Sequence, residues 1–167
     1  MAKQILIVDD EESIRWVLGK CLEKAGYRIE YAENGTQAVE KAAIKDFSAI
    51  LLDITMPDMS GFDVMEKVRR GGDAPPIIIM TARNTVKNAI DAMKQGAYDY
   101  IAKPFDLDEI TLTVKRALES YDNSKKLEIL KPDREEKERL HDIVGKTHPM
   151  INIYKLIGRM AARDIIV

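Results

Sequence analysis

Acidic side chains follow two short apolar runs, in places where they could act together. Asp9 and Asp10 come directly after the run that ends at Val8, and Asp53 follows the run that ends at Leu52. Like charges about 4 Å apart cost roughly 4 kcal/mol at an effective dielectric constant of about 20, so clustered carboxylates need a cation or protonation. A few carboxylate ligands that leave positions open to water are typical of Mg2+, with Mn2+ as the alternative. The three aspartates therefore predict a divalent-metal site that can also receive phosphate oxygens.

Two further side chains of suitable chemistry follow later apolar runs. Thr81, a hydroxyl donor, comes after Met80, and Lys103, a mobile cation, comes shortly after Ile101. The metal, the Lys103 ammonium and the Thr81 hydroxyl could bind the equatorial oxygens of a transferring phosphoryl group while the Asp53 carboxylate attacks in line. The expected product is an aspartyl phosphate.

Each of these side chains also has a simpler explanation when it is taken alone. Asp9 and Asp10 could be first-turn acids that favour a helix dipole. Thr81 could be a helix cap and Lys103 a surface lysine. Phosphoryl chemistry is favoured because residues of the required types follow four separate apolar runs.

The apolar runs predict a parallel sheet wrapped by helices. They lie at residues 4–8, 28–32, 48–52, 76–80 and 98–101, with apolar residues at helical spacing between them. Residues 50–52 and 77–79 do not alternate with polar residues, so both faces of these two runs should be buried. Short right-handed crossovers then favour an α/β fold with a doubly wound five-stranded parallel sheet, flavodoxin-like, in the order 2-1-3-4-5. Ligands of such sheets bind at the carboxyl ends of the first and third strands, where the three aspartates lie.

Composition excludes several classes of protein. The chain has 167 residues, 46% of them hydrophobic, with 26 basic and 28 acidic residues. This balance argues against a polybasic nucleic-acid binder. No apolar run approaches the roughly 20 residues that span a bilayer, and the amino terminus does not resemble a signal peptide. We therefore expect a cytoplasmic protein that does not enter a membrane, with the single cysteine, Cys21, as a small core residue.

A change of character near residue 120 predicts the domain organisation. Residues 1–120 are net acidic and carry the sheet pattern, so they should form the phosphoacceptor domain. Residues 121–140 are strongly charged and predict a helical linker that breaks or restarts at Pro132. Residues 141–167 become apolar again but are too few to enclose a core, as expected of the start of another domain.

The last helix of the first domain carries an apolar stripe that extends into the linker. Its residues are spaced by three and four, and they are Leu107, Ile110, Val114, Ala117 and Tyr121, followed by Leu127 and Leu130. Such a stripe could form a helix seam in a homodimer. Alternatively, its first part packs on the sheet of its own chain.

Four segments resemble the receiver domain of two-component response regulators. They are residues 7–11, 52–61, 80–82 and 98–105, with the sequences IVDDE, LDITMPDMSG, MTA and YDYIAKPF, and the similarity covers residues 3 to about 120. The resemblance implies that Asp53 accepts a phosphoryl group from a sensor histidine kinase.

The resemblance also implies roles for the residues around Asp53. Asp10 would bind the metal directly, and Asp9 mainly through water. The backbone carbonyl of Thr55 would complete the protein's share of the metal ligands. Lys103 would contact the phosphoryl group, and the Lys103–Pro104 peptide bond would be cis. Thr81 and Tyr100 match the pair that moves when the phosphoryl group arrives.

The end of the chain is similar to a narrower group of proteins. Residues 143–146, 157–159 and 161–164 resemble the beginning of the AAA+ ATPase domain in nitrogen-regulation-type, sigma-54-dependent activators. This similarity implies a homodimeric regulatory region, without its own ATPase site, that controls an AAA+ domain acting on sigma-54 RNA polymerase and DNA. The region would then not be an enzyme, apart from its self-phosphorylation and autodephosphorylation.

Other functions fit less of the sequence. A stand-alone receiver leaves the residues after Ser120 unexplained. A Mg2+-dependent phosphatase of the haloacid-dehalogenase type usually has a second aspartate two residues after the nucleophile, where this chain has Thr55. A flavodoxin-like FMN carrier needs hydroxyl and glycine donors in its first loop, where Asp9 and its acidic neighbours would repel the phosphate.

Overall fold

The structure is a computed structural model of the chain and describes residues 2–72, 74–82 and 86–129. The chain divides into two compact units, Met1–Asn123 and Ser124–Val167. The fold described here belongs to the first unit. Only the end of one helix is described in the second unit.

Five parallel strands form the sheet, in the order β2-β1-β3-β4-β5. They are β1 (Gln4–Val8), β2 (Arg28–Ala32), β3 (Ala49–Asp53), β4 (Ile77–Thr81) and β5 (Asp99–Ala102). The predicted fold class and strand order are confirmed.

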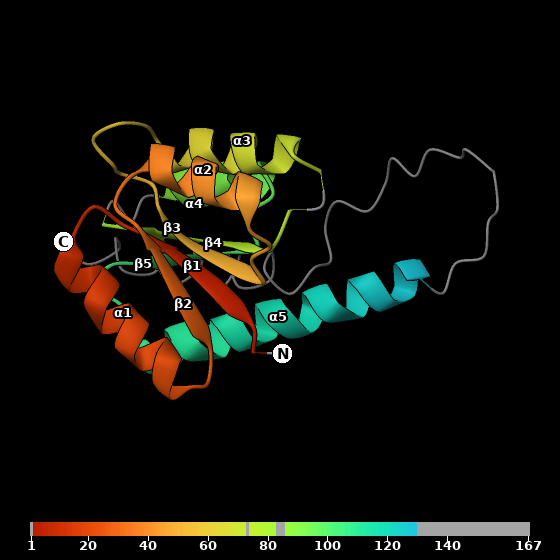
Figure 1. Cartoon of the computed structure of the whole chain (residues 1–167). Coiled ribbons are helices and arrows are strands. Elements are labelled where there is room, and N and C mark those ends of the chain that lie inside the picture. Colours follow the sequence, from red (N-terminus) through yellow and green to blue (C-terminus); the bar gives the residue numbers. More distant parts are fainter. Residues whose placement is uncertain (1, 73, 83–85, 130–167) are drawn as a thin grey trace, which may run out of the picture. The chain divides into compact units, whose positions relative to one another are not determined.

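Five helices cover the two faces of this sheet. They are α1 (Glu12–Lys24), α2 (Gly35–Ile44), α3 (Gly61–Arg70), α4 (Val86–Lys94) and α5 (Leu107–Ile129). In Figure 1, α2, α3 and α4 lie over one face, and α1 and α5 lie over the other. Ile5 and Ile7 of β1 pack with the α1 and α5 side, whereas Leu6 and Val8 pack with the other side. The central strands are thus buried on both faces, as their apolar runs predicted.

Three strands begin and end one residue later than predicted, which places Asp53 and Thr81 inside strands. In the register, Asp53 lies opposite Met80, and Thr81 lies opposite Ala102. A parallel ladder is made by backbone groups, so a polar side chain does not end it. The side chains of Asp53 and Thr81 therefore project from the last residues of β3 and β4.

Part of the dimer seam predicted on α5 is instead buried within the domain itself. Ile110, Val114 and Ala117 are fully buried in the core of their own domain. Leu107 is partly buried against the same core, and Tyr121 is half-buried. The spacing of three and four arises here because one helix face covers the sheet, so these buried side chains are unavailable to a partner helix. The side chain of Leu127 and the whole of Leu130 lie outside the described residues.

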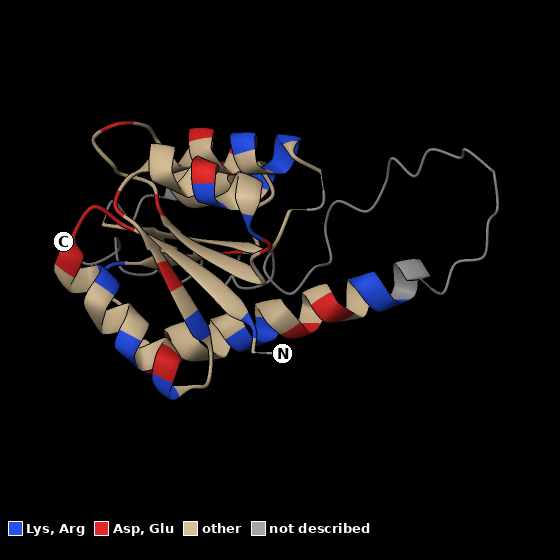
Figure 2. Ribbon diagram, in the orientation of Figure 1, with Lys and Arg blue, Asp and Glu red and all other residues tan. Residues whose placement is uncertain are grey.

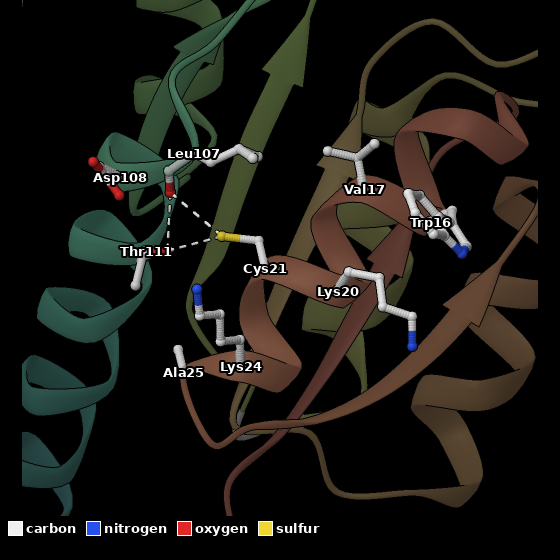
Figure 3. A pocket seen from close by; sticks show the side chains of 9 residues that line it. All are labelled: Trp16, Val17, Lys20, Cys21, Lys24, Ala25, Leu107, Asp108 and Thr111. Atoms are coloured by element: carbon white, nitrogen blue, oxygen red, sulfur yellow. Dashed lines mark hydrogen bonds between the residues drawn. The ribbon is translucent and has the colours of Figure 1, made fainter.

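A groove of about 590 Å³ lies between α1 and α5 (Figure 3). Cys21 points into it from α1, and its Sγ lies 3.3 Å from Oγ1 of Thr111 on α5. Cys21 is half-buried, so the prediction of a core cysteine is wrong. Trp16, at one side of the groove, is 62% exposed.

None of the helices in the described part of the chain is both long and apolar enough to cross a membrane.

Candidate functional site

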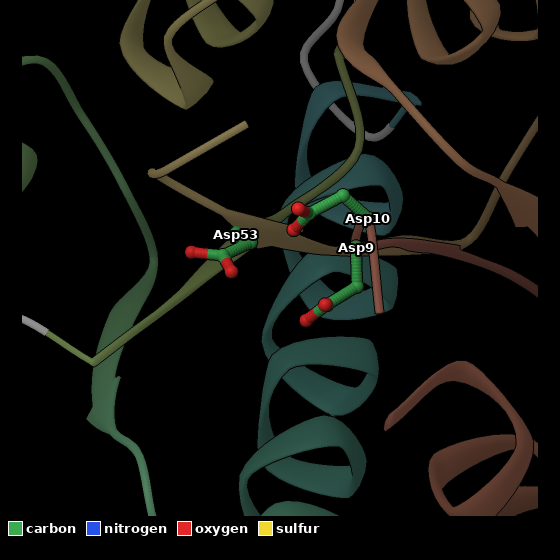
Figure 4. A group of neighbouring side chains, drawn as sticks. All are labelled: Asp9, Asp10 and Asp53. Atoms are coloured by element: carbon green, nitrogen blue, oxygen red, sulfur yellow. The ribbon is translucent and has the colours of Figure 1, made fainter. Parts of the chain in front are cut away.

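Three carboxylates meet at the carboxyl ends of β1 and β3 (Figure 4). One oxygen from each of Asp9, Asp10 and Asp53 lies within 4.8 Å of the others. Asp9 and Asp53 are buried, with 0% and 4% of their surface exposed, whereas Asp10 is exposed. Two of the carboxylates are thus buried at the strand ends, and the third, on Asp10, is open to solvent. Figure 2 shows the acidic loop between β1 and α1 in red, and α1 itself begins with a further acidic residue, Glu12.

The ends of the two strands are fixed by backbone contacts. The Asp9 amide donates to the Ala32 carbonyl oxygen at 3.2 Å, which extends the pairing of β1 with β2. A Cβ atom at Gly61 would lie 2.3 Å from the carbonyl oxygen of Asp53. Only glycine allows the start of α3 to approach the end of β3 so closely.

Both buried carboxylates are oriented by hydrogen bonds to each of their oxygens. Oδ1 of Asp9 accepts from the Glu11 amide at 3.1 Å, and Oδ1 of Asp53 accepts from the Thr55 amide at 3.0 Å. Their Oδ2 atoms both lie 2.6 Å from Nζ of Lys103. Lys103 thus bridges Asp9 and Asp53 from the loop after β5.

The charges in this bridge alter proton affinity in two ways. Burial acts to lower the pKa of Lys103, but the hydrogen bonds to Asp53 and Asp9 outweigh it and raise that pKa above its ordinary value. For Asp9, burial is the larger effect, and it raises the pKa despite the contact with Lys103. Lys103 is therefore a firmly charged ammonium placed between two carboxylates that are costly to bury.

The remaining residues predicted for the site lie at or near the same edge of the sheet. Thr81 is buried and ends β4, and its carbonyl oxygen accepts from the Lys103 amide at 2.7 Å. Thr55 lies in the loop after β3 with an exposed side chain. Tyr100 is half-buried on β5, and burial raises its pKa. The Lys103–Pro104 peptide bond is cis.

Comparison with known proteins decides the family. The response regulator receiver domain model matches residues 5–115. This chain belongs to the response regulator receiver domain family. The resemblance to a receiver domain that was found in the sequence is confirmed.

Curated relatives are longer than this chain. The transcriptional regulator NtrC of Escherichia coli K12 is 35% identical over 164 residues, which cover 96% of this chain and 34% of NtrC. The regulatory protein ZraR of Klebsiella oxytoca is 41% identical over 114 residues, or 68% of this chain and 26% of ZraR. The chain thus spans about a third or less of these two relatives.

Solved receiver domains share the fold. A CheY-like receiver domain from Methanospirillum hungatei JF-1 superposes with a TM-score of 0.71 and 29% identity, covering 74% of this chain and 99% of its own. The beryllofluoride-activated NtrC4 receiver domain dimer has a TM-score of 0.67 and 36% identity, covering 71% and 98%.

One acidic residue of the receiver domain was not identified from the sequence. Asp58, in the loop after β3, accepts hydrogen bonds from the Gly35 amide at 3.0 Å and from the amide and hydroxyl of Thr36, both at 2.8 Å. It therefore ties the loop that carries Thr55 to the first turn of α2. The contact joins residues more than 20 positions apart, so no local sequence pattern predicts it.

We expect Asp58→Ala to destabilise the receiver domain in a pH-dependent way. Burial acts to raise the pKa of Asp58, but the hydrogen bonds from Gly35 and Thr36 outweigh it and lower the pKa from 3.8 to about 2. A lowered folded-state pKa means that the stabilisation is present above about pH 4 and is lost as the pH falls through about 2. Because Asp58 is exposed, we expect a loss of only about 1 kcal/mol at pH 7, a typical net contribution of hydrogen bonding at an exposed site.

Urea unfolding of both proteins between about pH 7 and pH 2 measures this difference. The gap in the free energy of unfolding between wild type and Asp58→Ala should shrink toward the acid end. Asp46→Ala, at an exposed position before β3, is the control. A gap that is constant across the range would contradict the assigned hydrogen bonds.

Proposed function

We propose that this receiver domain accepts a phosphoryl group on Asp53 from a sensor histidine kinase in a Mg2+-dependent reaction. The observation that carries the proposal is the buried Asp53 carboxylate, which lies beside two other carboxylates and 2.6 Å from the Lys103 ammonium. This combination supports the proposal because a nucleophile, a metal site and a phosphoryl-binding cation would then lie together at one sheet edge.

The donors present fit Mg2+, with Mn2+ as the alternative ion. Asp9, Asp10 and Asp53 offer hard carboxylate oxygens, and the exposure of Asp10 leaves room for water and phosphate oxygens. In the proposed arrangement Asp10 is a direct ligand, Asp9 acts mainly through water, and the Thr55 carbonyl oxygen is a further ligand. When bound, the ion neutralises the carboxylates and offsets the negative charge of the phosphoryl group.

Asp53, Lys103 and Thr81 would each have a separate role in the phosphoryl transfer. One carboxylate oxygen of Asp53 attacks phosphorus in line, and the bond from phosphorus to the donor atom breaks with its electron pair leaving on the donor. The Lys103 ammonium contacts the phosphoryl oxygens, and the Thr81 hydroxyl donates to one of them. The Thr55 amide, which donates to Oδ1 of Asp53, keeps the carboxylate oriented.

Thr81 and Tyr100 are the proposed link from the site to the surface. Thr81 ends β4 and Tyr100 lies on the neighbouring strand β5. A shift of the Thr81 hydroxyl toward the new phosphoryl oxygens would leave space into which the Tyr100 ring can turn. The state of Asp53 would then be reported at the face formed by α4, β5 and α5.

We further propose that the domain regulates a sigma-54-dependent AAA+ transcription activator in the cytoplasm, and that it works as a homodimer. NtrC, a relative, is a DNA-binding transcriptional regulator, and the NtrC4 receiver was solved as a dimer. The AAA+ domain, sigma-54 RNA polymerase and DNA would be partners of the whole protein. The proposed linker, residues 121–140, and AAA+ start, residues 141–167, lie mostly outside the described residues. A stand-alone receiver remains the alternative.

Mg2+ should be required for phosphorylation, because three clustered carboxylates repel an incoming phosphate. We expect incubation with acetyl phosphate and Mg2+ to give one phosphoryl group per chain by intact-mass analysis. Chelation with EDTA should prevent it. An equal yield with EDTA would contradict the metal site, and fast release of phosphate without an adduct would favour the phosphatase alternative.

A further inference from the structure

Arg15, near the start of α1, contacts the backbone of the loop that carries two of the site's aspartates. Its Nη1 atom donates to the Asp9 carbonyl oxygen at 2.7 Å and to the Asp10 carbonyl oxygen at 3.1 Å. The Arg15 side chain is half-buried and reaches back by five and six residues to make these bonds. Its guanidinium thus holds the carbonyl groups of two successive peptide units.

The second of these peptide units connects Arg15 to a site carboxylate. The Asp10 carbonyl and the Glu11 amide belong to one planar trans peptide unit, in which C=O and N–H point in opposite directions. Arg15 binds the carbonyl side of this unit, and on the other side the Glu11 amide donates to Oδ1 of Asp9 at 3.1 Å. Three hydrogen-bonded groups therefore run from the guanidinium through one rigid peptide plane to the Asp9 carboxylate.

We propose that Arg15 is a positioning residue for the metal site. It fixes the peptide plane between Asp10 and Glu11, and that plane sets the direction of the Asp9 carboxylate. It also fixes the backbone from which Asp10 projects. The effect on metal binding rests on the proposed function of the three aspartates, whereas the effect on the loop does not.

This role differs from that of Lys103, which contacts the carboxylates themselves. Arg15 binds only carbonyl oxygens in these contacts, so it can orient the loop while the carboxylate oxygens stay available to an ion. Residues that orient metal ligands in this way commonly change metal affinity by 10- to 100-fold when they are lost.

The direction in which the Mg2+ affinity changes distinguishes a positioning role of Arg15 from a simple effect of its positive charge. Removing a positive charge beside a cation site favours cation binding by simple electrostatics. Removing a positioning residue weakens binding because the ligands must be ordered when the ion arrives. We therefore expect Arg15→Gln to bind Mg2+ about 10-fold more weakly than wild type. Arg15→Lys keeps a charged donor, so its affinity for Mg2+ should lie between those of wild type and Arg15→Gln.

Calorimetric titration with Mg2+ measures the dissociation constants. Lys20→Gln is the matched control, since it removes the same charge from an exposed position on the same helix. It should bind Mg2+ as wild type does. Equal or tighter binding by Arg15→Gln would overturn the proposal. If Arg15→Gln does not fold, Arg15→Lys decides. The proposal would be overturned if Arg15→Lys bound Mg2+ as tightly as wild type and its Glu11 amide exchanged at the wild-type rate.

Amide hydrogen exchange of the metal-free proteins gives an independent readout. The Glu11 amide should exchange faster in Arg15→Gln than in wild type, while amides of β3 should be unchanged. An unaltered Glu11 amide would overturn the proposal even if affinity falls. If wild type itself binds no Mg2+, the proposed function fails, and the exchange result still decides whether Arg15 orders the loop.

Discussion

Lys103→Met is expected to lower the free energy of unfolding of the metal-free domain by about 3–5 kcal/mol. The substitution removes the ammonium that lies 2.6 Å from both Asp9 and Asp53. Those carboxylates are 0% and 4% exposed, so solvent cannot replace the lost cation. Breaking a buried ion pair in this way leaves an uncompensated charge, which is far more costly than losing a surface pair.

Mg2+ should reverse much of this loss and should bind more tightly to the variant, because the competing ammonium is gone. Urea unfolding with EDTA and with Mg2+ measures both effects. Lys45→Met is the control: it breaks an exposed pair with Glu30 and should cost less than about 1 kcal/mol. The assigned bridge of Lys103 between Asp9 and Asp53 would be contradicted if both variants lost the same free energy of unfolding. It would also be contradicted if Mg2+ restored none of the stability lost in Lys103→Met.

The stabilisation of the folded domain by Lys103 depends on pH in a defined direction. The pKa of Lys103 is raised above its ordinary 10.5 by its two carboxylate partners. The stabilisation is therefore fully present at neutral pH and is lost only as the pH rises through the raised value.

The sheet could be predicted because its signal is local. β1 and β2 have the predicted bounds, Gln4–Val8 and Arg28–Ala32. β3 and β4 extend one residue farther, to Asp53 and Thr81, because backbone pairing continues where the apolar side chains stop. The clustering of Asp9, Asp10 and Asp53 followed from strand order, and the structure brings them together.

Other features could not be predicted because their partners are distant or are backbone atoms. The stripe of Ile110, Val114 and Ala117 marks a covered helix face, but spacing alone does not say whether a sheet or a second helix covers it. Asp58 accepts from backbone amides and Arg15 donates to backbone carbonyl oxygens. Nearly every residue carries such groups, so these contacts leave no pattern in the sequence.

Asp53→Asn is expected to abolish phosphorylation. An amide is a poor nucleophile, and the substitution also removes one of the three carboxylates proposed to hold the ion. The fold should survive, because asparagine has nearly the same shape and its side-chain oxygen can still accept from the Thr55 amide. Asp46→Asn, at an exposed position, is the control and should be phosphorylated as wild type is.

The most direct test is to map the phosphoryl group by tandem mass spectrometry after treatment with acetyl phosphate and Mg2+. We expect a single phosphoryl group on Asp53 in wild type and in Asp46→Asn, and none in Asp53→Asn. A phosphoryl group on another residue, or an undiminished adduct in Asp53→Asn, would show that Asp53 is not the phosphoacceptor.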